Sequence, residues 1–270
     1  MDITMTESAI ARATVLDLVP FGNPGSTPEF FALRLTPPEW PNWKPGQFLM
    51  LRPAKAGKEH LWARPFSICR LTARDLVIFF QVRGVGTREI AEFSVGEQID
   101  IWGPLGNAMA MEKDAPTLLI AGGIGIAPFV GYAHAHPVPW NLHMEFGHRH
   151  SLDCYPFDAL NEKIMIDAHH DRGPADTAAF VELLDKRVAE YAAQKGLVLA
   201  CGPTGLLKEV RRLAEKHGAR AQLSLETRMA CGVGACLGCV VKAKTDGADD
   251  FSHVQTCTCG PNFWADKVEF

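Results

Sequence analysis

The sequence contains no apolar run that approaches the roughly 20 residues needed to cross a bilayer. Its first residues, Met1 to Ile10, carry acidic side chains and lack the basic n-region of a secretory signal. Basic residues are not in excess, because 27 Lys and Arg stand against 31 Asp and Glu, for a net charge of -4. Such a surface does not attract a nucleic-acid backbone as a whole. We expect a cytoplasmic protein that binds neither nucleic acid nor a membrane.

Cysteine is also scarce over most of the chain. The eight cysteines are too few for a disulfide scaffold in 270 residues, and five of them fall between Cys231 and Cys259. The sequence shows no internal repeat, no low-complexity tract and no obvious Ser-His-Asp triad or carboxylate pair. With 47% hydrophobic and 21% charged residues, it is an ordinary globular chain that is long enough for two domains. The cysteine cluster indicates a metal site.

The first part of the chain predicts antiparallel β structure. Short β-like runs alternate with Pro and Gly turns, such as residues 21–25, at spacings that suit a barrel or sandwich rather than βαβ units. The expected strands are 11–19, 30–35, 47–51, 76–82 and 98–102. We expect a β-barrel domain over residues 1–110, which ends at a Gly/Asn turn and the charged stretch Glu112 to Asp114.

The pattern then changes to short apolar strands that alternate with helical stretches. The expected strands are 117–121, 142–146, 163–167, 198–201 and 221–225. Two amphipathic segments, around Leu184 and around Val210, would cover one face of a parallel sheet. We therefore expect a doubly wound α/β domain over residues 111–225. Residues 226–270 form a Gly/Cys-rich region that does not continue the alternation.

The strongest chemical signal is the run Cys231-x4-Cys236-x2-Cys239, followed by Cys257. Three thiolates on one loop and a fourth from downstream are the plant-type ferredoxin pattern for a 2Fe-2S cluster. Glycines within the loop would allow positive φ and bring backbone N–H groups toward the sulfurs. They are Gly232, Gly234 and Gly238. A structural zinc site is the alternative, although zinc sites usually present two C-x2-C knuckles. The spacing does not choose between Cys257 and Cys259 as the fourth ligand.

A second signal is a glycine turn between a buried strand and an expected helix. Its glycines are Gly122, Gly123 and Gly125. Such a turn lets a pyrophosphate approach the backbone at the helix N-terminus. The turn differs from the dinucleotide G-x-G-x-x-G fingerprint, so a tight structural turn is the alternative.

A third signal, Cys201-Gly202-Pro203, lies at the carboxyl end of another expected strand. Ligands bind outside these ends in open α/β sheets, so this run could border a nicotinamide. The alternative is a buried cysteine before a helix start.

Two more candidates lie in the expected barrel, Arg64-Pro65-Phe66-Ser67 and the glycine loop 84–87, which contains Gly86 and Thr87. Arginine can pair with a diphosphate, Ser67 can hydrogen-bond the edge of a flavin ring, and the loop would admit phosphate oxygens near the Thr87 hydroxyl. Without that context, an exposed arginine beside proline is a solvated strand end.

Taken in this order, the motifs resemble the ferredoxin-reductase-like superfamily, and within it the electron-transfer subunits of two-subunit, NAD-dependent dihydroorotate dehydrogenases. Four local motifs match in the family's order across almost the whole chain. They are Pro45-Gly46-Gln47-Phe48, Arg64 to Ser67, Gly122 to Pro128 and Cys201-Gly202-Pro203. The stretch Ser224 to Cys236 is similar to the cluster loop of that subunit rather than to a general ferredoxin loop.

The resemblance implies a barrel that binds FAD, an α/β domain that binds NAD(H) and a C-terminal 2Fe-2S cluster that faces a partner. The residues it implies in FAD binding are Arg64, Pro65, Phe66, Ser67, Phe79, Phe80, Gln81, Gly86 and Thr87. The candidates for the dinucleotide are Gly122, Gly123, Gly125, Gly202 and Pro203, and the candidate catalytic residues are Ser67 and Cys201. The family's fourth cluster ligand precedes a Gly-Pro, which favours Cys257 because Gly260-Pro261 follows.

Two positions depart from the family pattern. The family often shows Tyr-Arg where this chain has Phe80-Gln81, so a phenol and a cation that could hold FAD are missing. The family also tends to carry Asp-Asp-Gly where this chain has His169-His170-Asp171, so contacts with the adenosine of NADH could differ. By their position alone, these histidines are expected in an exposed loop after the strand 163–167.

The implied reaction converts two-electron chemistry to one-electron chemistry. NADH would pass a hydride to FAD, which would release electrons singly to the cluster. In the family the cluster serves an FMN-containing catalytic subunit that oxidises dihydroorotate to orotate in pyrimidine biosynthesis, with net flow toward NAD. We expect a hetero-oligomer with such a subunit. The alternatives are the same module with another partner, such as a hydrogenase or a ferredoxin:NADP oxidoreductase, and a zinc-binding protein without turnover.

Overall fold

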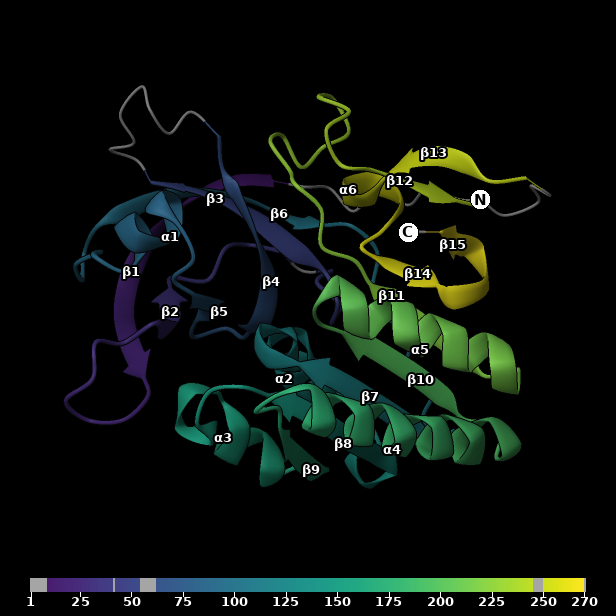
Figure 1. The fold of residues 1–270 in the computed structure, drawn as a ribbon. Helices are drawn as coiled ribbons and strands as arrows, with labels where there is room; N and C mark the ends of the chain where they lie inside the picture. Colours follow the sequence, from purple (N-terminus) through teal and green to yellow (C-terminus); the bar gives the residue numbers. More distant parts are fainter. Residues whose placement is uncertain (1–8, 41, 54–61, 245–249, 270) are drawn as a thin grey trace.

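The computed structural model describes residues 9–40, 42–53, 62–244 and 250–269. A closed barrel of six strands comes first in the chain, a six-stranded sheet with helices follows, and a small three-stranded sheet is formed near the C-terminus (Figure 1). In the part of the chain described, no helix combines the length and the apolar character that a membrane span requires.

The barrel has the strand order β1-β2-β5-β4-β3-β6, and each neighbouring pair is antiparallel. Inward-facing residues alternate along the strands, as Leu33 and Leu35 do on β2, and they pack into one apolar interior. This confirms the predicted antiparallel barrel. The strands are β1 (Ala9–Phe21), β2 (Phe30–Leu35), β3 (Phe48–Pro53), β4 (Arg64–Leu71), β5 (Leu76–Gln81) and β6 (Gln98–Leu105).

The second sheet has the order β14-β11-β10-β7-β8-β9, in which β7 to β11 are parallel and β14 pairs antiparallel with β11. Leu118 and Ile120 of β7 pack toward α4 and α5, whereas Leu119 and Ala121 pack toward α2 and the barrel. Both faces are covered, which explains why these strands are continuous apolar runs. The doubly wound prediction is confirmed. The strands are β7 (Thr117–Gly122), β8 (Leu142–His148), β9 (Met165–His170), β10 (Leu197–Cys201), β11 (Arg220–Ser224) and β14 (Asn262–Trp264).

The helices connect these strands in the alternation that a doubly wound sheet requires. The segments around Leu184 and Val210 are helical, as predicted, and lie in α4 and α5. In Figure 1 these two helices run side by side along one face of the sheet. The helices are α1 (Val85–Ile90), α2 (Ala127–Ala135), α3 (Phe157–Asn161), α4 (Pro174–Ala193), α5 (Thr204–His217) and α6 (Thr256–Cys259).

The expectation of a loop at His169 and His170 is wrong, because both residues belong to β9. The strand lies at the edge of the sheet, and most of its residues are exposed or only half-buried. An edge strand pairs with one neighbour and tolerates polar side chains, so its apolar pattern is too weak to mark where it ends.

The C-terminal region packs against both larger sheets. It contributes β14 to the parallel sheet and forms a separate sheet from β12 (Val240–Ala243), β13 (Ser252–Gln255) and β15 (Val268–Glu269). The side-chain amide of Asn262, which is buried, donates to the carbonyl oxygens of Asn107 at 2.9 Å and Gly46 at 3.2 Å. These bonds tie the end of the chain to the barrel.

The barrel and the parallel sheet share one apolar core. Phe30 and Phe79 of the barrel belong to the same buried cluster as Phe129 and Phe146 of the α/β part. The Tyr155 ring joins the two sides, because it lies 5.1 Å from the ring of Phe30 and 5.0 Å from that of Phe146. This core fixes the relative placement of the two parts and of the cavity between them.

Candidate functional site

A cavity of about 870 Å³ lies between the barrel and the carboxyl ends of the parallel strands. Such ends are the usual ligand site of open α/β sheets. Twelve of the residues named from the sequence line it: Pro65, Phe66, Ser67, Phe79, Phe80, Gln81, Thr87, Gly122, Gly123, Cys201, Gly202 and Pro203. The other three candidates for FAD or the dinucleotide, Arg64, Gly86 and Gly125, are not among the residues that line it. The structure therefore brings motifs from both parts of the chain to one cavity.

At the barrel end, the guanidinium group of Arg64 packs against the glycine loop. A Cβ on Gly86 would lie 3.0 Å from Arg64 Nε, so a larger residue would displace the arginine. The Thr87 hydroxyl oxygen accepts hydrogen bonds from the backbone N–H of Arg83, at an N–O distance of 2.8 Å, and from that of Gly84, at 3.1 Å. It therefore holds the start of α1 in place, and the loop expected from the sequence is the first turn of a short helix.

A cation stands close to the position where the family's arginine is missing. Gln81 Oε1 accepts a hydrogen bond from Arg83 Nε at 2.9 Å, and both residues line the cavity. Tyr155 supplies a phenol ring to the same lining. The chain thus provides a positive charge and a phenol near the cavity from positions other than 80 and 81.

On the α/β side, the three glycines of the turn have different environments. Gly123 has a φ of 53°, and a Cβ there would meet no atom within 4 Å, so its backbone faces open space. A Cβ on Gly122 would lie 2.8 Å from Pro203 and Leu206, and one on Gly125 would overlap the backbone carbonyl of Cys201. Gly123 leaves room for a phosphate, whereas Gly125 is required for close packing of the strand ends.

Cys201 is a buried wall residue with a neutral thiol. Burial raises its pKa to about 12, and the nearby charge of Glu226 acts in the same direction. Glu226 opens onto the cavity, yet the protein surrounding it raises its pKa by desolvation, and the positive charge of Arg83 opposes this shift. Glu226 was not predicted as a site residue from the sequence. Its position just after the carboxyl end of β11, where ligands bind in open sheets, is the feature that indicates it.

The cavity lining fits a flavin and a dinucleotide. The Thr227 hydroxyl is buried, lines the cavity and has no hydrogen-bond partner among the described residues. A buried hydroxyl without a partner is costly, so this group suits the polar edge of a ligand. The aromatic rings of Phe66 and Phe80, 5.9 Å apart, supply the apolar surface that a ring system needs.

The four candidate ligand cysteines lie beside the barrel. Gly232 and Gly234 have φ angles of 73° and 81°, as predicted, whereas the third residue with positive φ is Leu237 rather than Gly238. Backbone N–H groups point at the sulfurs, from Val233 and Cys236 to Cys231 Sγ at 3.4 Å each, and from Gly234 to Cys257 Sγ at 3.2 Å. Donors aimed at sulfur stabilise thiolate charge, which is what a cluster ligand carries.

The surroundings of Cys236 and Cys257 shift the pKa values of these two thiols in opposite directions. Backbone hydrogen bonds from Gly238 and Cys231 lower the pKa of Cys236 to about 7, and the Cys231 thiol adds to this shift. Burial raises the pKa of Cys257 to about 12, with a further contribution from its hydrogen bond to Cys239. This grouping is the donor set that an iron–sulfur cluster needs.

Cys257 and Cys259 have different surroundings. Cys257 is buried with Cys239 in an apolar cluster that also contains Met50 and Leu105 of the barrel. Cys259 packs instead against the apolar cluster formed by α5 and the parallel sheet. The structure therefore groups Cys257, and not Cys259, with the loop cysteines.

The cysteine loop rests directly on the barrel wall next to the cavity. Trp102 Nε1 of β6 donates to the Cys231 carbonyl oxygen at 3.0 Å, and a Cβ on Gly232 would lie 2.5 Å from Met50 of β3. Phe48 and Met229 line the cavity and also pack into the apolar cluster around Cys239 and Cys257. These two side chains therefore connect the cavity lining with the apolar cluster that holds Cys239 and Cys257.

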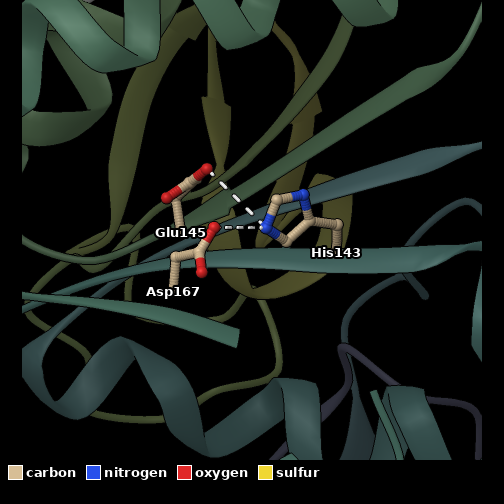
Figure 2. A group of neighbouring side chains, drawn as sticks. All are labelled: His143, Glu145 and Asp167. Carbon is tan, nitrogen blue, oxygen red and sulfur yellow. Dashed lines mark hydrogen bonds and ion pairs between the residues drawn. The ribbon is translucent and has the colours of Figure 1, made fainter. Parts of the chain in front are cut away.

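A second group of metal-binding residue types lies within the parallel sheet (Figure 2). The ligand atoms of His143, Glu145 and Asp167 lie within 4.8 Å of one another. A cation already occupies this group, because Arg187 Nε donates to the fully buried Glu145 at 2.7 Å and its Nη2 lies 3.5 Å from Asp167. His169 Nε2 lies 2.6 Å from the other Glu145 oxygen. We interpret the group as an ion-pair network around the buried Glu145 that connects β8, β9 and α4.

A six-stranded antiparallel barrel beside a doubly wound sheet, with a cavity between them and a loop of three cysteines plus Cys257 against the barrel, defines a ferredoxin-reductase-like fold. Solved structures share this fold. An NADH-dependent reduced ferredoxin-NADP oxidoreductase, described for flavin-based electron bifurcation, matches with a TM-score of 0.78 at 22% identity, over 96% of this chain and 90% of that chain. The ferredoxin-NADP+ reductase from Plasmodium falciparum matches with a TM-score of 0.63 at 15% identity, over 77% and 90%.

Curated relatives narrow this class to one family. Residues 226–269 match the model of the iron-sulfur cluster binding domain of dihydroorotate dehydrogenase B. The dihydroorotate dehydrogenase B (NAD(+)) electron transfer subunit of Caldanaerobacter subterraneus is 34% identical over 86% of this chain and 90% of the relative. The protein of the same name from Listeria monocytogenes is 34% identical over 83% and 87%. The chain belongs to the family of dihydroorotate dehydrogenase B electron transfer subunits, which confirms the family expected from the sequence.

Proposed function

We propose that this chain carries electrons between NAD(H), FAD and a 2Fe-2S cluster, and exchanges them with an FMN-containing dihydroorotate dehydrogenase catalytic subunit in a hetero-oligomer. The main support is that Phe48 and Met229 both line the cavity and pack in the apolar cluster that holds Cys239 and Cys257. Membership of the family and the iron-sulfur match support the cofactor set of FAD, 2Fe-2S and NAD(H).

The barrel residues bind and orient FAD in this proposal. Arg64 and the loop at Gly86 hold its diphosphate, and Ser67 donates to the edge of its ring system. Arg83, held by Gln81, supplies a positive charge to the same cavity. When bound, FAD exchanges two electrons with a nicotinamide and single electrons with an iron–sulfur cluster.

The α/β residues hold the dinucleotide against the flavin side of the cavity. Gly123 leaves space for the pyrophosphate, and Cys201, Gly202 and Pro203 form the wall beside the nicotinamide. The neutral Cys201 thiol places no charge near the nicotinamide, so Cys201 acts as a contact residue. The chain contributes position and electrostatics to the reaction and supplies no nucleophile.

Cys231, Cys236, Cys239 and Cys257 hold the cluster in this proposal. The N–H groups of Val233, Gly234 and Cys236 stabilise the charge of its sulfur ligands. Cys236 is exposed and marks the side of the loop from which a partner subunit can approach.

Spectroscopy and metal analysis of the purified chain test the electron-transfer chemistry. We expect flavin bands together with broad visible absorption from the cluster, about two irons per chain, and bleaching of the flavin bands with partial bleaching of the cluster absorption when NADH is added without oxygen. A colourless protein, or one that contains zinc in place of iron, contradicts the proposal.

The partner is tested by co-purification from cells that express the chain at its natural level. We expect an FMN-containing protein that oxidises dihydroorotate and reduces NAD only while this chain is bound. Recovery of a hydrogenase subunit instead of that protein contradicts the assigned partner and leaves the electron-transfer chemistry intact.

A further inference from the structure

The end of the cavity formed by β8 and β9 is the part that an adenosine would reach. In dinucleotide-binding sheets, the strand next to the glycine turn carries the residue that contacts the adenosine ribose. An acidic residue there accepts the 2′-hydroxyl of NAD, whereas an arginine accommodates the 2′-phosphate of NADP. In this chain the glycine turn follows β7, and the neighbouring strand is β8, which ends at His148.

The turn after β8 carries no acidic residue. Its sequence is His148-Arg149-His150-Ser151, and the first three of these residues line the cavity. The next strand ends in His169 and His170, which line the same end of the cavity. Imidazole and guanidinium groups therefore stand where a dinucleotide site selective for the free 2′-hydroxyl has a carboxylate.

The carboxylates at this end each receive hydrogen bonds from an arginine. Asp171 accepts from Arg149 Nε at 2.8 Å and, through its other oxygen, from the Thr177 hydroxyl at 2.8 Å. Asp176 accepts from the backbone N–H of Arg172 at 3.0 Å and from its Nε at 3.1 Å. The charge of Asp171 and Asp176 is balanced by these arginines. The two carboxylates therefore do not make this end of the cavity, the corner formed by residues 148–151 and 169–171, acidic.

Arg149 is the side chain best placed to meet a phosphate. Its side chain is 77% exposed and touches Asp171 through Nε, which leaves the two terminal nitrogens for a ligand. An exposed ion pair of this kind holds the guanidinium only weakly, so a phosphate can bind the two terminal nitrogens at small cost while Nε stays on Asp171. The His170 ring stacks 5.1 Å from that of His148, and its Nε2 lies 3.2 Å from the Arg149 carbonyl oxygen, so it holds the backbone of Arg149 in place.

We propose that this corner binds a 2′-phosphate on the adenosine, so that the chain accepts NADP(H) as well as NAD(H). The inference rests on the proposed function, because it assumes that a dinucleotide crosses the β7 turn with its adenosine over β8 and β9. It goes beyond the names of the curated relatives, which mention NAD(+) alone.

Calorimetric titration of the holoprotein with three adenosine nucleotides tests the inference without using catalysis. We expect 2′,5′-ADP to bind at least tenfold more tightly than 5′-AMP, and also at least tenfold more tightly than 3′,5′-ADP, which has the same charge. If 5′-AMP binds as tightly as 2′,5′-ADP, the 2′-phosphate inference is overturned and the proposed dinucleotide site stands. If 3′,5′-ADP matches 2′,5′-ADP, the gain is general charge attraction, and the inference is again overturned. If none of the three binds, the dinucleotide site itself is wrong.

A charge-reversal variant tests whether the tighter binding of 2′,5′-ADP arises at this corner. Arg149→Glu should remove the tenfold gain for 2′,5′-ADP and leave the affinity for 5′-AMP within about twofold. The matched control is Arg12→Glu, because Arg12 is an exposed arginine on the barrel strand β1 that also pairs with one aspartate, Asp100. We expect the control to keep the full gain. If Arg149→Glu keeps the gain while remaining folded by circular dichroism, the corner does not bind the phosphate.

Discussion

At the scale of single residues, Cys257 and Cys259 provide a matched pair of substitutions. We expect Cys257→Ser to abolish the visible absorption of the cluster, because its Sγ accepts the Gly234 N–H and lies in the same apolar cluster as Cys239. Flavin binding and electron transfer from NADH to a dye should persist, since neither uses the cluster. Cys259→Ser should keep the cluster. Loss of the cluster in Cys259→Ser alone would show that the ligand assignment is wrong.

Glu226 gives a second prediction at this scale, through the dependence of stability on pH. Its pKa is raised in the folded chain, so the native state binds its proton more tightly than the unfolded state does. The carboxyl therefore costs stability as the pH rises above its ordinary pKa. We expect Glu226→Gln to raise the melting temperature at pH 7 to 8, and the difference from wild type to vanish near pH 4.

Glu112 is the control, because the fold shifts its pKa in the opposite direction. Its hydrogen bond to Arg220 lowers the pKa of the Glu112 carboxyl, so its charged form stabilises the native state. Glu112→Gln should lower the melting temperature at neutral pH, and this loss should vanish as the pH falls through the lowered pKa. If both variants shift in the same direction at pH 7, the role given to Glu226 is wrong.

At the scale of secondary-structure elements, the turn between β7 and α2 depends on one close approach. A Cβ on Gly125 would overlap the Cys201 carbonyl at the end of β10, so Gly125→Ala must push the turn after β7 away from that strand end. We expect a loss of about 1–3 kcal/mol in the free energy of unfolding, measured in denaturant, together with weaker NADH binding. Gly205→Ala on α5 is the control, because a Cβ there meets no atom within 4 Å. It should leave stability unchanged or raise it by up to about 1 kcal/mol. Equal losses in the two variants would contradict this reading of the turn.

The elements also show what the sequence can and cannot reveal. Buried strands such as β7 and β10 are apolar runs bounded by Gly or Pro, so they are predictable from the sequence. The edge strand β9 is mostly exposed, and its end at His170 leaves no apolar signal. Four cysteines at a fixed spacing indicate a metal site in the sequence. Glu226 is a single acidic residue, and the cavity that it lines forms only when the barrel packs against the parallel sheet. Strands, helices and local motifs can therefore be predicted from the sequence, whereas contacts between elements that are distant in the chain cannot.

At the scale of the whole molecule, Asn262 joins the C-terminal region to the barrel. Its amide donates to the carbonyl oxygens of Gly46 and Asn107, and its backbone N–H donates to Asn107 Oδ1 at 3.0 Å. Asn262→Ala leaves buried carbonyl groups without donors, which costs about 1–3 kcal/mol. We expect a lower melting temperature and faster bleaching of the cluster by a chelator. Asn141→Ala, which removes an exposed hydrogen bond to Lys113, should change neither quantity. Unchanged bleaching in Asn262→Ala would show that this link does not hold the cluster region.

The bond between Asn262 and Gly46 also bears on the order of folding, because it spans 216 residues of sequence. Synthesis delivers the barrel first, and contacts at such separation form late. Cys257 reaches the three loop cysteines only when the last segment of the chain has docked on the barrel that was made first. A metal group that requires all four sulfurs can therefore be inserted only after residues up to Cys257 have been synthesised and docked. Insertion of the cluster then reports that the region around Cys257 and Asn262 has docked correctly on the barrel, before any electron is transferred.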